Sequence, residues 1–243
     1  MQETAEPVIR IDDLIFSWSA GLDPLLEIGQ LEIQAGEKLF IEGPSGSGKS
    51  TLLNLLAGVL VPQRGEVRIL GKGMTTTGSA DRDRFRADHI GVIFQMFNLI
   101  PYLSVTENVT LPCRFSKEKY NKTTERGEGP ASEAHRLLRA LNLADPELVR
   151  RSVTDLSVGQ QQRVAAARAL IGAPDIVIAD EPTSSLDAGH REAFLTLLFQ
   201  ECEQAGTTLV FVSHDGSLSR LFDRSLALQT INKASTPSAA MEA

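Results

Sequence analysis

Residues 43–51, GPSGSGKST, have the types and spacing of a loop that wraps around the phosphates of a nucleotide. They follow an apolar strand pattern, KLFIE, and precede a helical pattern, STLLNLLAG. The glycines let backbone N–H groups approach phosphate oxygens closely. Lys49 is expected to reach the β- and γ-phosphates, and Ser50 to place its hydroxyl on Mg²⁺. The predicted phosphate-binding residues are Gly43, Pro44, Ser45, Gly46, Ser47, Gly48, Lys49, Ser50 and Thr51.

A second group of chemically competent residues ends the apolar stretch DIVIAD at 175–180. A buried strand would deliver Asp180 at its carboxyl end, where α/β sheets place their ligands. We expect Asp180 to hold Mg²⁺ through water and Glu181 to polarise the attacking water. Adjacent carboxylates are costly to desolvate at the end of a buried strand, which favours a functional role over a solvated charge pair.

The stretch LSVGQ, residues 156–160, predicts a helix start that can hold an anion. Ser157 and Gln160 have the three-residue spacing of a capping box. A cap needs only these two side chains. Gly159 has no side chain, so it also leaves backbone N–H groups accessible at the positive end of the helix dipole. The stretch lies more than 100 residues beyond Lys49 in the chain. The spacing therefore raises the question of whose phosphate this helix would bind.

Three further residues occupy positions that suggest a role at a ligand. His214 follows the strand pattern TLVFVS, and Gln95 follows GVIF, so both lie at predicted carboxyl ends of strands. A single histidine is more often structural, and Gln95 alone carries little weight. Trp18 ends the pattern LIFSW and can equally be a core side chain or an exposed aromatic.

The composition is that of an ordinary globular protein of 243 residues, with 42% hydrophobic and 23% charged residues. A net charge of −7 argues against nucleic acid as a partner, because nucleic-acid-binding surfaces are basic. Cys113 and Cys202 are expected to be buried thiols in a reducing compartment. The sequence shows neither a signal-peptide pattern nor an apolar run that would span a membrane, so we expect a cytoplasmic protein.

The pattern of elements positions these residues in an α/β fold with a parallel sheet. Alternation between residues 7 and 42 predicts short, mostly antiparallel strands. Helices are expected near 49–57, 133–143, 157–171 and 188–205, and strands near 65–71, 89–95, 175–180 and 207–214. The polar stretch 116–133 is interpreted as a solvated connection. Residues 232–243 are expected to form a disordered tail.

Taken in order, GPSGSGKS, LSVGQ, IVIADE, SSLD and SH resemble the motifs of an ATP-binding cassette (ABC) ATPase over residues 7–230. The resemblance implies a P-loop NTPase fold. Its parts are a RecA-like parallel-sheet core, an N-terminal antiparallel β subdomain and an inserted helical subdomain. One ABC domain is expected over residues 1–231, with its core at about 7–95 and 172–231 and its helical lobe at about 96–171.

The same resemblance implies specific roles for the candidate residues. Gln95 becomes the Q-loop glutamine that senses Mg²⁺ and the membrane subunit, Asp187 the D-loop aspartate, His214 the switch histidine and Trp18 the aromatic that stacks on adenine. Ser157, Gly159 and Gln160 become a signature that closes on ATP bound by a second copy in a head-to-tail dimer. The implied catalytic residues are Lys49, Gln95, Glu181 and His214, and the implied Mg²⁺ ligands are Ser50, Gln95 and Asp180.

Three positions depart from the family pattern. Val158 replaces the first glycine of SGGQ and stiffens the backbone there, although Gly159 can still approach ATP closely. Ser185 stands in SSLD where many members have Ala or Asn. The stretch RSLALQTINKAS lacks the Asp-Gly turn that commonly closes the last hairpin, so the pairing of the last strand is open.

The stretch HIGVIFQMFNLIPYLSVTENVTLP resembles the LolD, MacB and FtsE type of ABC ATPase. That type works with integral membrane permeases, here expected to be FtsX- or MacB-like, with a periplasmic adaptor as a further candidate partner. The implied function is an ATP-hydrolysing motor subunit at the cytoplasmic face of the inner membrane. Residues 96–102 are interpreted either as packing of the helical lobe or as a groove for a permease helix. A soluble scaffold ATPase like that of iron–sulfur assembly is the alternative. A DNA-maintenance ATPase is disfavoured, because coiled-coil heptads and a basic surface are absent.

Overall fold

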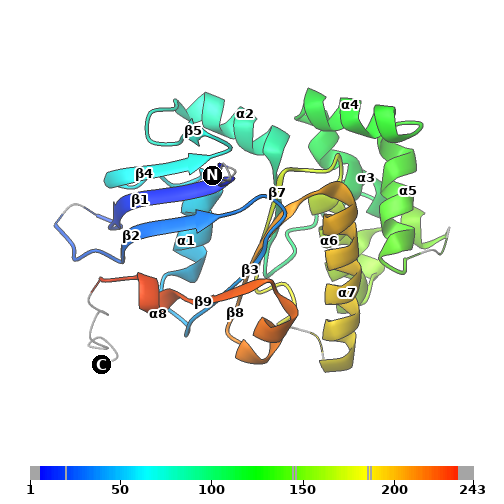
Figure 1. Ribbon diagram of the computed structural model, residues 1–243. Coiled ribbons are helices and arrows are strands. Elements are labelled where there is room, and N and C mark those ends of the chain that lie inside the picture. The colour runs from blue at the N-terminus through cyan, green and yellow to red at the C-terminus, as the bar shows by residue number, and fades with distance from the viewer. Residues whose placement is uncertain are drawn as a thin grey trace, which may run out of the picture. The chain divides into compact units, whose positions relative to one another are not determined.

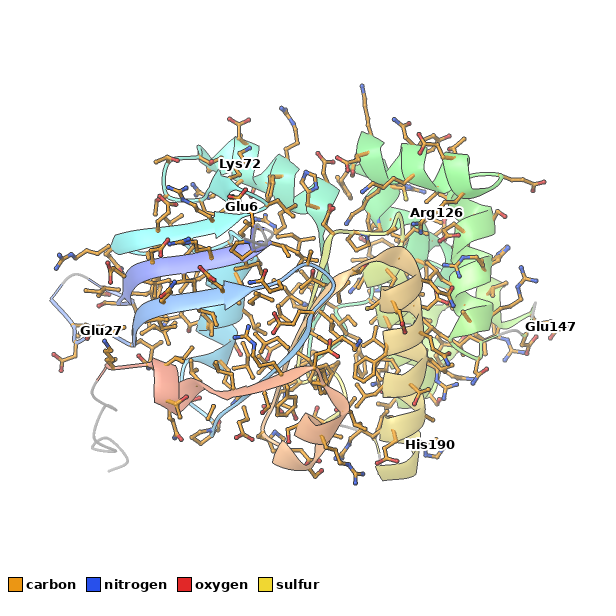
Figure 2. All side chains as sticks on the ribbon, viewed as in Figure 1. Glu6, Glu27, Lys72, Arg126, Glu147 and His190 are labelled. Carbon is orange, nitrogen blue, oxygen red and sulfur yellow. The ribbon has the colours of Figure 1, made fainter. Side chains whose placement is uncertain are left out.

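The computed structural model describes residues 6–19, 21–143, 145, 147–184, 186 and 188–234. The chain divides into two compact units, the first formed by residues 1–83 and 212–243 and the second by residues 84–211. Charged side chains such as Lys72 of the first unit and Arg126 of the second project outward from their ribbons (Figure 2).

The first unit contains a four-stranded antiparallel sheet in the order β2-β1-β4-β5. Its central strand β1 pairs with β2 and β4 on its two sides, so that Ile9 faces both Ile33 and Ile69 (Figure 1). The buried positions of β1 and β2 fall on one face, as the sequence alternation predicts. The strands are β1 (Ile9–Phe16), β2 (Leu26–Ile33), β4 (Arg64–Ile69) and β5 (Lys72–Gly73).

A parallel strand pair lies beside this sheet within the first unit. Strand β3 (Lys38–Glu42) pairs with β9 (Arg224–Ala227) in register from Leu39↔Arg224 to Glu42↔Ala227. Strand β9, whose pairing the sequence left open because it lacks an Asp-Gly hairpin turn, therefore pairs in parallel with β3. After α8 (Leu228–Ile231), the amide of Asn232 bonds Glu27 N at 2.8 Å and Leu25 O at 3.0 Å. Residues 235–243 of the predicted tail lie outside the described residues.

The remaining elements of the first unit include the helix that follows β3. Helix α1 ends before Gly58, which adopts a φ of +66°, the left-handed conformation common just after a helix. Helix α2 and strand β8 continue from one unit into the other. The elements are α1 (Lys49–Leu56), α2 (Ser79–His89), β8 (Thr208–Ser213) and the 3₁₀ helix η4 (Gly216–Leu221).

The second unit combines a parallel strand pair with a group of helices. Strand β6 pairs with β7 from Ile90↔Ile176 to Ile93↔Ala179, and both strands are almost entirely buried. Helices α5, α6 and α7 lie side by side (Figure 1). The elements are β6 (Ile90–Ile93), β7 (Ile176–Asp180), α3 (Val105–Thr110), η1 (Leu111–Arg114), α4 (Lys117–Arg126), α5 (Pro130–Ala140), η2 (Leu148–Arg150), η3 (Val153–Asp155), α6 (Val158–Leu170) and α7 (Ala188–Ala205).

Helix α4 corrects the interpretation of residues 116–133 as a solvated connection. Ser116 caps this helix by accepting a hydrogen bond from Lys119 N. Lys119 is only 2% exposed, and its ammonium donates to Ile90 O at 2.9 Å. Polar composition concealed the helix because its buried side is formed by a lysine stem and by Thr123 rather than by apolar residues.

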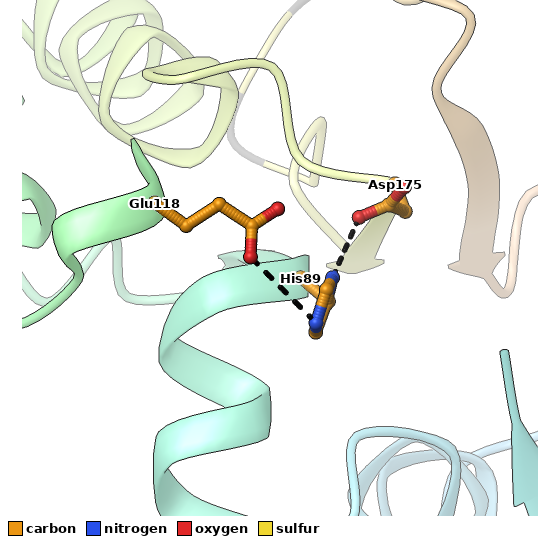
Figure 3. A group of neighbouring side chains, drawn as sticks. All are labelled: His89, Glu118 and Asp175. Carbon is orange, nitrogen blue, oxygen red and sulfur yellow. Dashed lines mark hydrogen bonds and ion pairs between the residues drawn. The ribbon is translucent and has the colours of Figure 1, made fainter. Parts of the chain in front are cut away.

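His89, Glu118 and Asp175 join three elements of the second unit, namely the end of α2, the first turn of α4 and the residue before β7 (Figure 3). The His89 ring places Nδ1 2.8 Å from Asp175 and Nε2 3.9 Å from Glu118. These residues could ligate a metal ion, but Lys122 already pairs with Glu118 at 3.0 Å. We therefore interpret the group as an ion-pair brace.

The hydrogen bond between His89 and Asp175 lowers the pKa of Asp175 and raises the pKa of His89. At a pH between these two pKa values, Asp175 is negatively charged and His89 is positively charged. The stabilisation by this brace is complete below the ordinary histidine pKa and is lost as the pH rises through the folded pKa of His89. We expect His89→Gln to lower the unfolding free energy by about 0.5–1 kcal/mol at pH 6, a value limited by solvent screening at the half-exposed Asp175.

Urea unfolding at pH 6 and pH 8.5 measures this effect, with the exposed His135→Gln as control. A loss of stability equal at both pH values would contradict the charged brace.

Candidate functional site

The loop between β3 and α1 has the backbone of a phosphate-binding cradle. Gly46 and Gly48 adopt φ values of +78° and +95°, which L-residues with side chains rarely take. A Cβ at Gly48 would also lie 2.9 Å from Leu26 Cδ2. The chain thus turns sharply at Gly48, which is the N-cap of α1 and supplies no side-chain cap. The sequence prediction of a glycine loop opening a helix agrees with this geometry.

Lys49 extends back into the loop that precedes it. Its side chain is buried at 7% exposure, and its ammonium donates to Gly43 O at 2.7 Å and Pro44 O at 2.9 Å. The nearby Ser47 Oγ is buried without a hydrogen-bond partner among the described residues. A buried cation and an unsatisfied hydroxyl inside a glycine loop fit the oxygens of a polyphosphate.

Trp18 and His214 are the other predicted site residues in the first unit. Trp18 is 62% exposed and meets the ring of Phe16 edge-on at 5.3 Å, so it is not a core side chain. Its exposure leaves a face of the indole accessible for stacking. His214 is exposed and directly follows β8, as predicted.

In the second unit, β7 ends at Asp180, and Glu181 follows with a φ of +45°. A left-handed conformation is uncommon for a residue with a long side chain and costs about 1–3 kcal/mol. Such outliers gather at functional sites, where the surrounding structure holds them. The turn is closed by Ser184 N, which donates to Glu181 O at 3.2 Å. This conformation sharply redirects the chain immediately after the strand.

Gln95 lies in an exposed turn just after β6. Of the predicted Mg²⁺ ligands, Ser50 belongs to the first unit, whereas Gln95 and Asp180 belong to the second. Asp187 and the variant position Ser185 lie outside the described residues.

The capping box predicted at the start of α6 is confirmed. Ser157 N donates to Gln160 Oε1 at 2.9 Å, and Gln160 N donates to Ser157 Oγ at 3.3 Å. Val158 points outward with 50% exposure. A Cβ at Gly159 would only touch Leu186 Cδ2 at an ordinary 3.6 Å, and its φ is not left-handed. The chain's own fold therefore does not require glycine at position 159.

Sequence reasoning missed Arg168, whose guanidinium holds the backbone just after Gln95. A signal was present, because Arg168 shares a helical face with Val164 and Ala165 at the i−4 and i−3 positions, both of which are buried. An arginine on an apolar face predicts a partly buried guanidinium that binds backbone carbonyls.

The sequence matches a known protein family over more than half of its length. The family model described as "ABC transporter" matches residues 26–184, which include the loop at Lys49, the cap at Ser157 and the turn at Glu181. The chain belongs to the ABC transporter ATP-binding family. This ABC cassette has the predicted α/β architecture, with parallel strand pairs, an antiparallel sheet and helices.

Its relatives include the subgroup that the sequence suggests. The cassette is 37% identical over 229 residues to the lipoprotein-releasing system ATP-binding protein LolD of Xylella fastidiosa, covering 93% of this chain and 92% of LolD. It is 41% identical to the uncharacterized ABC transporter ATP-binding protein YbbA of Escherichia coli, covering 92% and 95% of the two chains.

Solved structures agree with this assignment. The cassette superposes with a TM-score of 0.77 and 34% identity on a dimeric post-hydrolysis state of the ATP-binding cassette MJ0796 bound to ADP and Pi. That match covers 90% of this chain and 93% of MJ0796, a protein of Methanocaldococcus jannaschii. Among the described residues of this chain, no helix is long and apolar enough to cross a membrane.

Proposed function

We propose that this chain is the ATP-hydrolysing motor subunit of a membrane transport or mechanotransmission complex. The observation that carries the proposal is the glycine cradle with buried Lys49, found in one chain with the capped, glycine-bearing start of α6. The glycine loop with Lys49 is suited to the phosphates of ATP. The start of α6 is suited to an anion, which we propose to be a phosphate of ATP bound by a second copy.

The proposed reaction is attack of water on the γ-phosphorus of ATP, in which the bond to the β–γ bridging oxygen breaks and ADP and phosphate are released. Lys49 neutralises charge on the β- and γ-phosphates, and Glu181 orients the water and accepts its proton. His214 contacts the γ-phosphate, and Trp18 stacks on adenine. Mg²⁺ would be held by Ser50, Gln95 and, through water, Asp180, and it would supply positive charge to the phosphate oxygens.

We further propose that two copies sandwich ATP head-to-tail, with Ser157 and Gly159 of one copy closing on ATP held by Lys49 of the other. The structures of MJ0796 are dimeric, one of them with ADP and Pi bound, which supports a dimer as the working form. Because Gly159 has room for a side chain within its own chain, the space above it is available for a phosphate from a partner. Asp187 is proposed to lie at the same dimer interface.

Gly159→Ala tests that explanation of the glycine. We expect the melting temperature to stay the same or rise slightly, because alanine favours a helix by up to about 1 kcal/mol relative to glycine. ATP hydrolysis should fall about 10-fold or more, since the methyl group occupies the space proposed for the phosphate. Calorimetry and a steady-state ATPase assay measure the two effects. Unchanged hydrolysis would show that the glycine has no role at the nucleotide.

The membrane link is proposed to involve the exposed apolar side chains around Gln95. Met96 and Tyr102 are 80% and 84% exposed, and Phe94 is 40% exposed, whereas Phe97 is buried at 8%. Exposed apolar side chains near a catalytic turn are typical of an interface. We propose that they receive a helix of an FtsX- or MacB-like permease at the cytoplasmic face of the cell membrane.

Affinity purification from detergent-solubilised membranes tests this partner. We expect an integral membrane permease to co-purify with the unmodified chain and to be lost with Met96→Glu, while Tyr120→Glu, an exposed aromatic on α4, serves as the control. Recovery of soluble partners alone would favour the scaffold ATPase instead.

A further inference from the structure

The backbone just after Gln95 is held in an unfavourable conformation. Phe97 and Asn98 have consecutive φ values of +59° and +48°, and neither is glycine. Each such residue costs free energy and persists only where its surroundings fix it. The side chain of Phe97 is buried at 8%, and its N–H donates to Phe94 O at 2.9 Å. Something in the second unit must therefore hold this turn in place.

Arg168 supplies that restraint from the last turn of α6. Its guanidinium donates to Phe97 O at 2.5 Å and to Asn98 O at 2.6 Å, the carbonyls of the two strained residues. Burial lowers the pKa of Arg168 below its ordinary value. Arg168 is only partly exposed, so its guanidinium loses some of its hydration, and peptide carbonyl dipoles compensate for that loss. A fork of donors spanning two adjacent carbonyls fixes position as well as distance.

The strand that leads to Gln95 contacts the same turn of α6. A Cβ at Gly91 of β6 would lie 2.1 Å from Ala169 O, so the two backbones pack directly against each other. Two contacts with the last turn of α6 therefore flank Gln95. Gly91 packs against Ala169 before it, and the carbonyls of residues 97 and 98 accept from Arg168 after it.

A second clamp fixes the chain farther along. Asn108 of α3 is fully buried, and its side chain accepts from Ile100 N at 2.7 Å and donates to Ile100 O at 3.0 Å. Helix α3 itself packs against α6. Residues 97–100 therefore behave as part of the body that contains α6, rather than as an independent loop.

The other end of α6 carries Ser157 and Gly159. A helix rises about 1.5 Å per residue, so Arg168 lies about 17 Å along α6 from Ser157. We infer that Arg168 is a positioning residue that fastens the Gln95 turn to the signature helix, so that the turn and the signature move as one body. This inference rests on the proposed function and assigns to Arg168 a coupling role within it.

The test uses Arg168→Met in the Glu181→Gln background, where ATP is bound but not hydrolysed. Arg163→Met is the matched control, because Arg163 is on the same helix, is partly exposed like Arg168, and donates only weakly, at 3.4 Å, to Asn142 O. We expect Arg168→Met to bind ATP as tightly as the control. Its ATP-dependent dimerisation constant, measured by sedimentation, should weaken about 10-fold or more.

Kinetics in the otherwise unmodified chain give a readout that a structural role would not move. Arg168→Met should lower kcat with little change in the KM for ATP, and Arg168→Lys, which keeps a cation that can reach a carbonyl, should restore part of kcat. Arg168→Lys also serves if the methionine variant does not fold.

The outcomes separate the two proposals. If Glu181→Gln alone forms no ATP-dependent dimer, the proposed function fails. If it dimerises and Arg168→Met matches the control in dimerisation and kcat, or if Arg168→Lys matches it where the methionine variant does not fold, the positioning role of Arg168 is overturned and the proposed function stands.

Discussion

Glu181→Gln is expected to lower ATP hydrolysis about 1000-fold or more while leaving ATP affinity within about threefold of the unmodified chain. General base catalysis contributes about 10²–10⁴-fold, and an amide cannot accept the proton of the attacking water. Gln matches Glu in size and can keep the hydrogen bond that Glu181 O accepts from Ser184 N. The strained backbone, with φ of +45°, is therefore retained and only the carboxylate is lost.

Single-turnover hydrolysis and equilibrium ATP binding separate the chemical step from binding. Glu192→Gln on α7 is the matched control, because it removes an exposed carboxylate from the same unit. Hydrolysis by Glu181→Gln within tenfold of the control would contradict the assignment of Glu181 as the base.

Lys49→Met is expected to weaken ATP binding about 100-fold and to abolish hydrolysis. The ammonium is the buried charge of the cradle, and hydrogen bonds made by a charged group are worth about 1.5–3 kcal/mol each. Methionine keeps most of the buried stem, and water can satisfy Gly43 O and Pro44 O because the loop is partly exposed. The melting temperature without nucleotide should change little.

A thermal-shift titration with ATP measures this loss, since a ligand that binds only the folded state stabilises it by RT ln(1 + [L]/Kd), which falls as Kd rises. Lys72→Met, an exposed lysine in β5, should show the full shift. An ATP-induced shift in Lys49→Met equal to that of Lys72→Met would show that the cradle does not bind the phosphates.

The parts of the fold set by local sequence could be predicted. The glycine loop at 43–51 requires left-handed backbone at Gly46 and Gly48, and both residues adopt it. The capping box of Ser157 and Gln160 follows from a three-residue spacing, and the alternation of β1 follows from its half-buried face. In each case, residues near one another in sequence determine the geometry.

What escaped prediction depends on contacts between distant residues. Helix α4 is stabilised by Lys119, whose ammonium finds Ile90 O far away in the sequence. The left-handed conformation of Glu181 contradicts its own propensity, and so does that of Phe97, whereas Asn98 tolerates this region better. Arg168 compensates for the last two from a position 70 residues along the chain. Local patterns cannot reveal such pairings, so neither helix α4 nor the contact made by Arg168 could be predicted from them.

The claim that one ATP is bound by two copies has a direct test in mixed subunits. Lys49→Met loses the ammonium that binds the phosphates but keeps the signature at Ser157 and Gly159. Ser157→Arg keeps the glycine loop with Lys49 but blocks the signature. Either variant alone should be inactive. In an equal mixture, half of the dimers contain one intact composite site, so about one quarter of the unmodified ATPase activity should return. A mixture no more active than its two components, with both variants folded and Ser157→Arg still binding ATP, would contradict a site shared between two copies.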